Sequence, residues 1–277
     1  LFVELLAGLF LQAFIIRLLG REAYSLWPIA SACLGFLSLI PMGVGYGAGR
    51  FMAHSFSRKA IDEANQIASS LFFAMAGAAI LYLGISVSVG IFFDDLFTIP
   101  AGLEGVGLRV MVLLGLAGAV SMPISVYRGG LVATQQFVAI NAIAIAMCLM
   151  RVGLIVGLFT LGHKGLFWLA AVNFMTSVAE GLVICILSKR LVPWQRIRLT
   201  YFRWSILRET FSFSGLVLLN RLFGLLYWQT DYILINKLLD PALATGYAVV
   251  ASIIQKIQAI VTAGCGVIMP AVASLQA

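Results

Sequence analysis

Long apolar runs are the feature that most constrains this chain, because they recur from one end of the sequence to the other. A helix needs about 20 apolar residues to cross the hydrocarbon core of a bilayer. Only 10% of the residues are charged and 62% are hydrophobic, whereas a soluble domain carries about 25% charged residues. The sequence therefore predicts an all-α integral membrane protein whose outer surface mostly faces lipid.

The apolar runs predict eight membrane spans. They cover residues 1–19, 24–49, 67–93, 108–132, 137–161, 166–187, 211–239 and 244–271. The connections are short except for 50–66, 94–107 and 188–210, and none could hold a folded extramembrane domain. Short connections force neighbouring helices to run antiparallel, so a multi-pass bundle is expected.

The sequence also contains an internal repeat, in which two distant stretches share the same pattern of apolar and polar residues. Residues 17–20 (RLLG) align with residues 237–240 (KLLD), and the apolar run 27–53 aligns without a gap with 247–273. An internal repeat in a membrane protein usually means two bundles with a site between them. We therefore expect one six-helix lobe in 1–187, a linker in 188–210 and the first two helices of a second lobe in 211–277. The chain starts inside an apolar stretch without Met and stops soon after the last span, so we expect a fragment with a truncated first helix.

Basic residues in the connections predict the orientation, because cytoplasmic loops carry an excess of Lys and Arg. The richer side holds Arg50, Arg58, Lys59, Arg128, Lys189, Arg190, Arg196, Arg198, Arg203 and Arg208. The other side holds Arg17, Arg21, Arg109, Lys164 and Lys237. The first side and the N-terminus are therefore expected in the cytoplasm. The linker 188–210 mixes cations with aromatic residues, which suits the anionic inner leaflet better than nucleic acid.

A glycine-rich stretch ends the second predicted span. Pro41 is followed by Gly43, Gly45 and Gly47, and no strand or Lys-Ser/Thr accompanies them as a phosphate-binding loop would require. Either these residues let another helix pack closely, or they form a hinge at which the helix bends during transport. Pro123 in the fourth predicted span allows the same two interpretations.

Ionisable residues inside the predicted spans are the clearest functional candidates, because each costs a few kcal/mol in a bilayer unless it is paired or hydrated. Arg151, Arg221 and Lys256 all fall near mid-depth at about 1.5 Å per residue. The counter-charges available to these three cations are Glu4 and Glu180, while Asp231 lies near the outer end of the seventh predicted span. The excess of cations predicts a hydrated, electropositive cavity that would bind an anionic cargo. The alternative is that Arg151–Glu180 and Lys256–Glu4 are structural ion pairs.

Polar amides within the spans could contact sugars or other helices. These residues are Gln12, Asn141, Asn173, Asn220 and Gln229, of which Asn220 and Gln229 are candidates for cargo binding. The sequence contains no recognisable catalytic set, nucleotide motif or metal-ligand spacing. We expect no enzyme activity, no cofactor and no metal.

Three stretches resemble a known family. The segment 17–27 (RLLGREAYSLW) is similar to the R-x-L-G-x-x-x-[FY]-G-x-[WY] opening of the polysaccharide exporters, with Ser25 in place of the usual Gly. The segment 231–247 (DYILINKLLD…TGY) resembles the start of that family's second lobe. The segment 128–141 (RGGL…QQ…N) is similar to the link between its fourth and fifth helices. These exporters belong to the multidrug/oligosaccharidyl-lipid/polysaccharide (MATE-like) superfamily.

The resemblance implies a bundle of two six-helix lobes and a role in flipping undecaprenyl-diphosphate-linked oligosaccharides across the bacterial cytoplasmic (inner) membrane. O-antigen or other lipopolysaccharide precursors are examples of such a cargo. The expected partners are the bilayer, the polyprenyl-diphosphate-linked glycan, and a glycan polymerase and glycosyltransferases. A cation-coupled drug antiporter of the same fold is the alternative, with Glu4 or Glu180 as its coupling carboxylate. A membrane glycosyltransferase, polymerase or ligase would need a larger extramembrane loop than any seen here.

Overall fold

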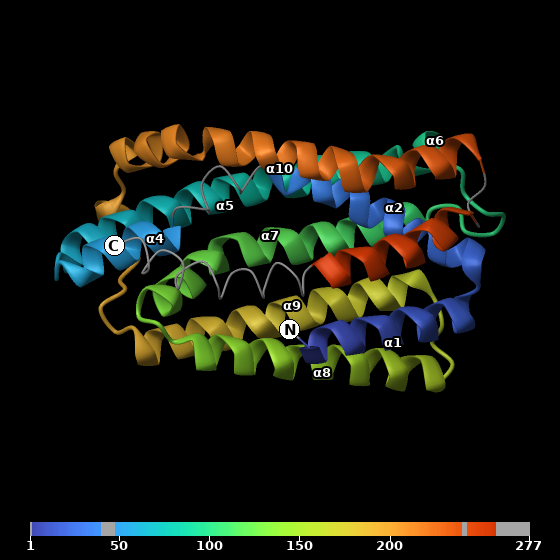
Figure 1. Cartoon of the computed structure of the whole chain (residues 1–277), viewed down its shortest axis with the longest axis horizontal. Helices are drawn as coiled ribbons and strands as arrows, with labels where there is room; N and C mark the ends of the chain where they lie inside the picture. Colours follow the sequence, from blue (N-terminus) through green and yellow to red (C-terminus); the bar gives the residue numbers. More distant parts are fainter. Residues whose placement is uncertain (1, 40–47, 240–242, 259–277) are drawn as a thin grey trace, which may run out of the picture.

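The computed structural model describes residues 2–39, 48–239 and 243–258, and every regular element among them is a helix (Figure 1). The helices are α1 (Phe2–Leu19), α2 (Arg21–Leu37), α4 (Ala48–Ser57), α5 (Ile61–Ile91), α6 (Phe93–Leu96), α7 (Val106–Ala133), α8 (Phe137–Thr160), α9 (Leu166–Leu191), the 3₁₀ turn η1 (Leu199–Tyr201) and α10 (Trp204–Leu238). The segment 243–258 is also helical.

Four of the described helices, α5, α7, α8 and α9, are long and apolar enough to cross a bilayer. Large apolar side chains lie on their outer faces, with Ile80 77% and Val138 85% exposed. Helices satisfy their backbone hydrogen bonds internally, which makes them suitable for a solvent that offers no such partners. The all-helical, multi-pass membrane class predicted from composition is confirmed.

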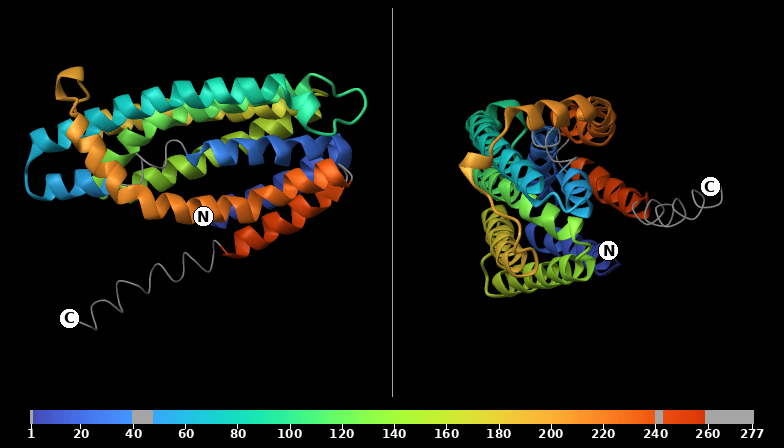
Figure 2. Two further views of the ribbon diagram at one scale, coloured as in Figure 1. Left: turned by 90° about the horizontal axis from the view of Figure 1, so that it is seen from above. Right: turned by 90° about the vertical axis from the view of Figure 1, so that its left-hand side faces the viewer.

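The helices lie side by side along a common direction (Figures 1 and 2). α5 packs along α7, α7 along α9, and α9 along α8. α1 contacts α8 and α2, and α10 packs against α2 and α5. The segment 243–258 joins them through a small cluster in which Ala248 and Ala251 pack with Ala32 of α2 and Tyr232 of α10.

Small residues bring α5 and α7 close together. A Cβ atom added to Gly115 of α7 would lie 2.5 Å from Ser86 Oγ of α5, and one added to Gly118 would lie 2.6 Å from the Tyr82 ring. Ser86 is fully buried and donates a hydrogen bond to the Met111 carbonyl at 2.8 Å. Glycine and serine at a helix interface allow this close approach, which gains van der Waals contact where lipid offers no hydrophobic driving force.

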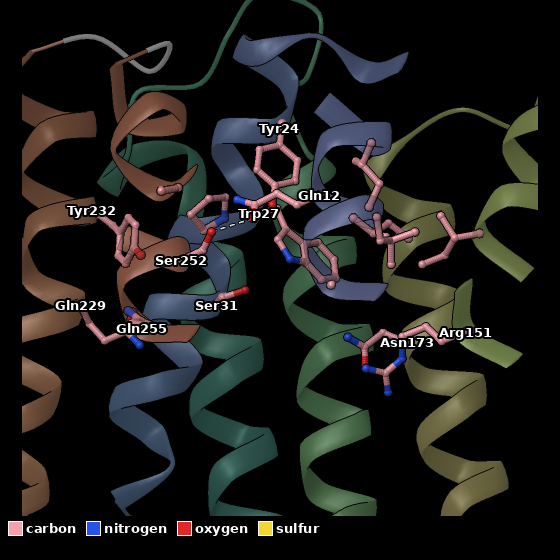
Figure 3. Close-up of a pocket in the computed structure, with 17 residues that line it drawn as sticks. Gln12, Tyr24, Trp27, Ser31, Arg151, Asn173, Gln229, Tyr232, Ser252 and Gln255 are labelled. Carbon is pink, nitrogen blue, oxygen red and sulfur yellow. Dashed lines mark hydrogen bonds between the residues drawn. The ribbon is translucent and has the colours of Figure 1, made fainter. Parts of the chain in front are cut away.

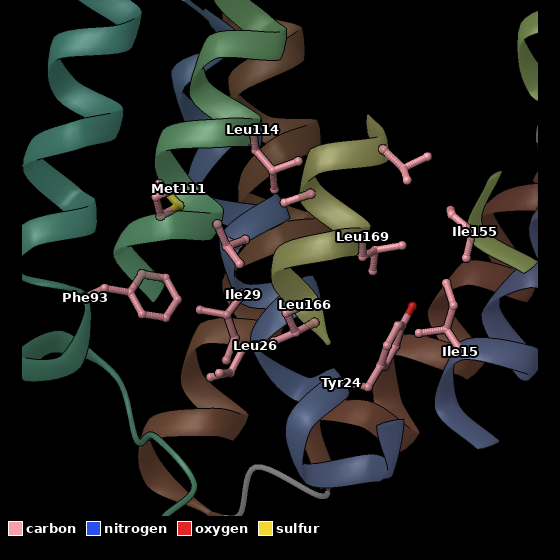
Figure 4. Close-up of a cluster of buried hydrophobic side chains, with 14 of the residues drawn as sticks. Ile15, Tyr24, Leu26, Ile29, Phe93, Met111, Leu114, Ile155, Leu166 and Leu169 are labelled. Carbon is pink, nitrogen blue, oxygen red and sulfur yellow. The ribbon is translucent and has the colours of Figure 1, made fainter. Parts of the chain in front are cut away.

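A buried apolar cluster holds α2 in place near one end of the bundle (Figure 4). Leu26 and Ile29 of α2 are 2% and 0% exposed. They pack with Met111 of α7 and with Leu166 of α9, and Phe93 closes the cluster from α6. One face of α2 is thereby fixed in the core, which leaves another face free to line a cavity.

The structure corrects several predicted boundaries. α4 (Ala48–Ser57) is a helix where the sequence predicted a loop. The prediction missed it because the polar residues of this stretch hide the burial of Met52, which is fully buried. α5 and α10 begin several residues before the predicted spans, at Ile61 and Trp204, and α9 continues to Leu191. The hinge candidates Pro41, Gly43, Gly45 and Gly47 lie outside the described residues.

The chain path also tests how the predicted loops group together. The α4–α5 turn, the α7–α8 turn and segment 192–203 lie at one end of the bundle, on the left of Figure 1. The α1–α2, α6–α7 and α8–α9 connections lie at the other end. The basic-rich connections therefore share one end, as predicted, while the side of the membrane that this end faces remains a prediction.

Candidate functional site

A cavity of about 470 Å³ lies between α1, α2, α8 and α9 on one side and α10 and segment 243–258 on the other (Figure 3). Each helix contributes residues spaced three or four apart, which places them on one face. The lining residues are Gly8, Leu11, Gln12, Ile15, Tyr24, Trp27, Pro28, Ser31, Arg151, Ile155, Leu169, Asn173, Gln229, Tyr232, Ala248, Ser252 and Gln255. Elements from the two ends of the sequence therefore meet around one space.

The lining combines one cation with amides, hydroxyls and aromatic rings. Arg151 is the single charged side chain among the described residues that line this cavity. Figure 3 shows Arg151 and Asn173 on one side, with Gln229 and Gln255 on the other and Ser31 between them. The site is thus polar but contains no carboxylate among its lining residues.

Arg151 is held by a hydrogen bond rather than by an ion pair. Its Nε donates to Thr176 Oγ1 of α9 at 3.2 Å. Thr176 is fully buried and its hydroxyl donates to the Val172 carbonyl at 2.9 Å, so the acceptor is fixed in direction. Within the described residues Arg151 forms no ion pair. The guanidinium therefore retains donors that can face the cavity.

The last two helices are attached to the first bundle by polar contacts. Ser252 donates to Gln12 Oε1 of α1 at 2.7 Å, drawn as the dashed line in Figure 3. Thr245 donates to the Arg21 carbonyl at 2.6 Å. Gln229 lies against α2, where a Cβ atom added to Gly35 would come within 3.0 Å of its Nε2. Gly35 therefore leaves room for the Gln229 amide at the edge of the cavity.

A second cavity of about 350 Å³ adjoins the first and is lined by residues of α1, α7, α8 and α9. Gly8, Leu11 and Arg151 line both cavities. Glu4 and Glu180 line the second one together with Arg128. The two carboxylates singled out in the sequence thus line the smaller cavity with Arg151 and do not line the larger one.

The structure gives Glu180 a different partner from the one considered in the sequence. Glu180 pairs with Arg128, with Nη1 and Oε1 separated by 3.5 Å, and not with Arg151. Arg128 reaches Glu180 because α7 and α9 pack along each other. Lys256 forms no ion pair within the described residues; its Nζ would lie 3.2 Å from a Cβ atom added to Gly8. Lys256 therefore lies beside the glycine that both cavities share.

The other candidates fall in different places. Asn220 is exposed on α10 and does not line either cavity, and the side chain of Arg221 lies outside the described part. Asp231 accepts a hydrogen bond from the Tyr247 hydroxyl and lines a separate cavity between α10 and segment 243–258. α7 continues as a helix through Pro123, so a hinge there stays a prediction.

Sequence reasoning missed several residues of the larger cavity. Tyr24, Trp27 and Ser31 are spaced three and four apart on α2. Tyr232 follows Gln229 by three positions on α10, and Gln255 follows Ser252 by three. The available signal was this spacing of polar and aromatic residues within apolar spans, since such residues share a helix face. Only the packing of the helices shows that the faces converge.

The chemistry of this lining suits a ligand with both an anionic group and hydroxyls. A guanidinium binds phosphate oxygens through parallel N–H donors. Side-chain amides both donate and accept, which matches sugar hydroxyls, and aromatic rings offer flat apolar faces with a polar edge. The aromatic rings here are those of Tyr24, Trp27 and Tyr232.

These features define a multi-pass helical membrane protein with a polar cavity between its helices. A family model described as "Polysaccharide biosynthesis protein" matches residues 2–276. The chain belongs to this family, which is MATE-like, and the resemblance found in its sequence motifs is confirmed. Searches of curated proteins and of solved structures found no significant match.

Proposed function

We propose that this protein is a transporter that flips a lipid-linked oligosaccharide or polysaccharide precursor across the cytoplasmic membrane by alternating access. In this proposal the cargo is an undecaprenyl-diphosphate-linked glycan. The head group enters the larger cavity while the polyprenyl chain stays in lipid. The family membership supports a role in polysaccharide biosynthesis, and the cavity supports a cargo that is anionic and rich in hydroxyls.

The main support for the proposal is that Arg151 lies in a membrane span without an ion pair among the described residues. A cation within a membrane span is expensive unless a counter-charge or water stabilises it. Thr176 gives Arg151 one neutral acceptor, and no ion pair to it occurs within the described residues. A diphosphate in the cavity would supply the missing negative charge. Lys256, next to Gly8, would add a second positive charge close to the same place.

The remainder of the lining supports the glycan part of the proposal. Gln12, Asn173, Gln229 and Gln255 offer both donors and acceptors, and Trp27 offers an aromatic face. The cavity volume of about 470 Å³ falls within the range of about 300–1,000 Å³ that is usual for ligand sites. No covalent step is required, so transport needs no catalytic residue.

A cation-coupled drug antiporter is the second candidate. Glu4 and Glu180 line the smaller cavity and favour it to that extent. A cationic cargo would, however, meet Arg151 in the larger cavity with no carboxylate among the lining residues there. Coulomb repulsion in a medium of low dielectric constant would oppose its binding. The lining therefore favours the anionic cargo.

The proposal includes two lobes, residues 1–187 and 211–277, that rock about the cavity between them. The basic-rich end would face the cytoplasm, where the lipid-linked glycan is assembled. A glycan polymerase and glycosyltransferases would be the functional partners. Asn220, Arg221 and Asp231 stay candidates for contacts that form in another state of the transport cycle.

The test compares Arg151→Ala with Arg151→Lys and with Arg109→Ala, which removes an exposed cation from the start of α7. Binding of undecaprenyl diphosphate to the purified protein should weaken about tenfold or more with Arg151→Ala, because a charge-assisted contact to phosphate is lost. Arg151→Lys should weaken it less, and Arg109→Ala should leave it unchanged. Unchanged binding in Arg151→Ala, with the protein folded, would refute the proposed role of Arg151.

A companion experiment follows surface display of the glycan in cells. Replacing Arg221 and Lys256 together with Ala should reduce export, because both would face the anionic head group during transport. Export at the normal level, with the double variant present in the membrane, would remove both residues from the mechanism.

A further inference from the structure

The segment between α9 and α10 is docked on the bundle through its backbone. Asn65, Ser69 and Ser70 lie on one face of α5, and their side chains are 3%, 0% and 0% exposed. Asn65 Oδ1 accepts from the Arg196 backbone N–H at 2.7 Å. Ser69 Oγ accepts from the Arg198 N–H at 3.1 Å, and Ser70 Oγ accepts from the Arg203 N–H at 2.8 Å. Three buried neutral side chains therefore fix the path of an irregular segment.

A second set of contacts fixes the start of the same segment. Gln195 Nε2 donates to the Val126 carbonyl of α7 at 3.0 Å, and Ser188 Oγ donates to Gln195 Oε1 at 3.0 Å. Gln195 fits over Gly130, where an added Cβ atom would overlap the Gln195 Oε1 atom. Trp194 stacks on Phe56 of α4 with ring centroids 5.1 Å apart. The segment is therefore anchored to α4, α5, α7 and α9.

Docking of the backbone leaves the basic side chains outside. We define the basic collar as Lys189, Arg190, Arg196, Arg198, Arg203 and Arg208, all of which are exposed. Leu199 and Trp204 lie among them and are 71% and 69% exposed. This combination of cations and exposed apolar groups occurs at an end of the helix bundle, where α9 ends and α10 begins (Figure 1).

The charge balance differs between the two ends of the bundle. At the collar end the exposed acids with described side chains on neighbouring α5 are Asp62 and Glu63, against the collar together with Arg58 and Lys59. At the other end, exposed cations and exposed acids are nearly equal in number among the described side chains. The cations there are Arg17, Arg21, Arg109, Lys164 and Lys237, and the acids are Glu22, Asp94, Asp95 and Glu104. Positive charge is thus concentrated at the collar.

We propose that the basic collar is a preorganised binding surface for anionic phospholipid head groups of the leaflet that it faces. Each Lys or Arg near an anionic membrane surface gains about 1 kcal/mol. Trp and Leu at this level would enter the interfacial region beside the head groups. Because the backbone is already fixed by α5, binding does not have to order it, whereas a free loop would lose backbone freedom on binding. The proposal is independent of the cargo.

The experiment measures lipid retention by native mass spectrometry of the protein released from mixed vesicles of phosphatidylglycerol and phosphatidylcholine. The protein is expected to retain phosphatidylglycerol at least about fivefold over its share in the vesicle. The variant Arg196→Gln/Arg198→Gln/Arg203→Gln should reduce this enrichment to less than about twofold. The matched control Arg21→Gln/Arg109→Gln/Lys164→Gln changes the net charge equally at the other end and should keep it.

A third variant separates preorganisation from charge. Asn65→Ala/Ser69→Ala retains every cation but removes two of the acceptors that dock the segment, and it should lower the enrichment at least about twofold. Gel filtration and circular dichroism identify any variant that has not folded. An equal loss in the collar and control variants, or no enrichment in the unmodified protein, would overturn the lipid site. Full enrichment in Asn65→Ala/Ser69→Ala would overturn preorganisation.

Discussion

Arg151 and Thr176 are joined by a hydrogen bond of 3.2 Å between Nε of the guanidinium and the threonine Oγ1. Thr176 is fully buried and its hydroxyl is itself directed back to the carbonyls of its own helix. The bond links α8 to α9 and fixes the direction of the cation that lines both cavities. The position of this cation therefore depends on a neutral residue that lines neither of the two cavities.

Thr176→Val should weaken the binding of undecaprenyl diphosphate about tenfold, because Arg151 loses its acceptor while the shape at position 176 is retained. A hydrogen bond to a charged group contributes about 1.5–3 kcal/mol, and about 1.4 kcal/mol corresponds to a factor of ten. Thr176→Ser keeps the hydroxyl and should bind almost normally. Titration of each purified variant with the lipid measures the effect. Equal binding by Val and Ser variants would show that Thr176 does not orient Arg151.

The ion pair of Arg128 with Glu180 should contribute little to stability. Its side chains are 45% and 28% exposed and its nitrogen and oxygen are 3.5 Å apart, and exposed pairs contribute about 0.2–1 kcal/mol. A double-mutant cycle with Arg128→Ala and Glu180→Ala, measured by denaturant unfolding in detergent, should give a coupling in this range. The matched cycle of Arg151→Ala with Glu180→Ala should give a coupling near zero. A larger coupling for Arg151 would support the Arg151–Glu180 pair that the sequence left open as an alternative.

Gly115→Ala should destabilise the protein by about 1–3 kcal/mol, because the new methyl group would overpack the contact between α7 and α5. The added Cβ atom would lie 2.5 Å from Ser86 Oγ, which is buried and hydrogen-bonded. Gly153→Ala is the control, since nothing lies within 4 Å of its added Cβ atom. Thermal unfolding in detergent should show a lower midpoint for the first variant alone. Similar midpoints would contradict the close packing at Gly115.

Asn236→Ala should also destabilise the protein by about 1–3 kcal/mol, the cost of leaving polar partners unsatisfied. Asn236 is 1% exposed and its amide makes two bonds to one peptide unit, accepting from Thr98 N–H at 3.1 Å and donating to the Thr98 carbonyl at 3.3 Å. These bonds attach the end of α10 to the connection before α7. Asn141→Ala, at an exposed position on α8, should change the unfolding free energy by less than about 0.5 kcal/mol. An equal effect of both substitutions would contradict the structural role of Asn236.

The sequence by itself determined the class of the protein and most of its helices. Apolar runs of membrane-spanning length depend only on local composition, so α7 and α8 agree with the predicted spans within two residues. The motifs around Arg17–Trp27 and Asp231–Tyr247 likewise indicated the family that the whole-chain match confirms. Such local signals can be recognised without knowing which helices are in contact.

Only the tertiary structure decided which side chains share a space. The partner of Glu180 is Arg128, and Arg151 is oriented by Thr176, because the rotation of α7, α8 and α9 about their axes sets these contacts. The docking of segment 192–203 on Asn65 and Ser69 was equally hidden, since a buried serine or asparagine in an apolar span gives no sign of its partner. Helix rotation and long-range packing are properties of the assembled bundle, and composition along one helix does not contain them.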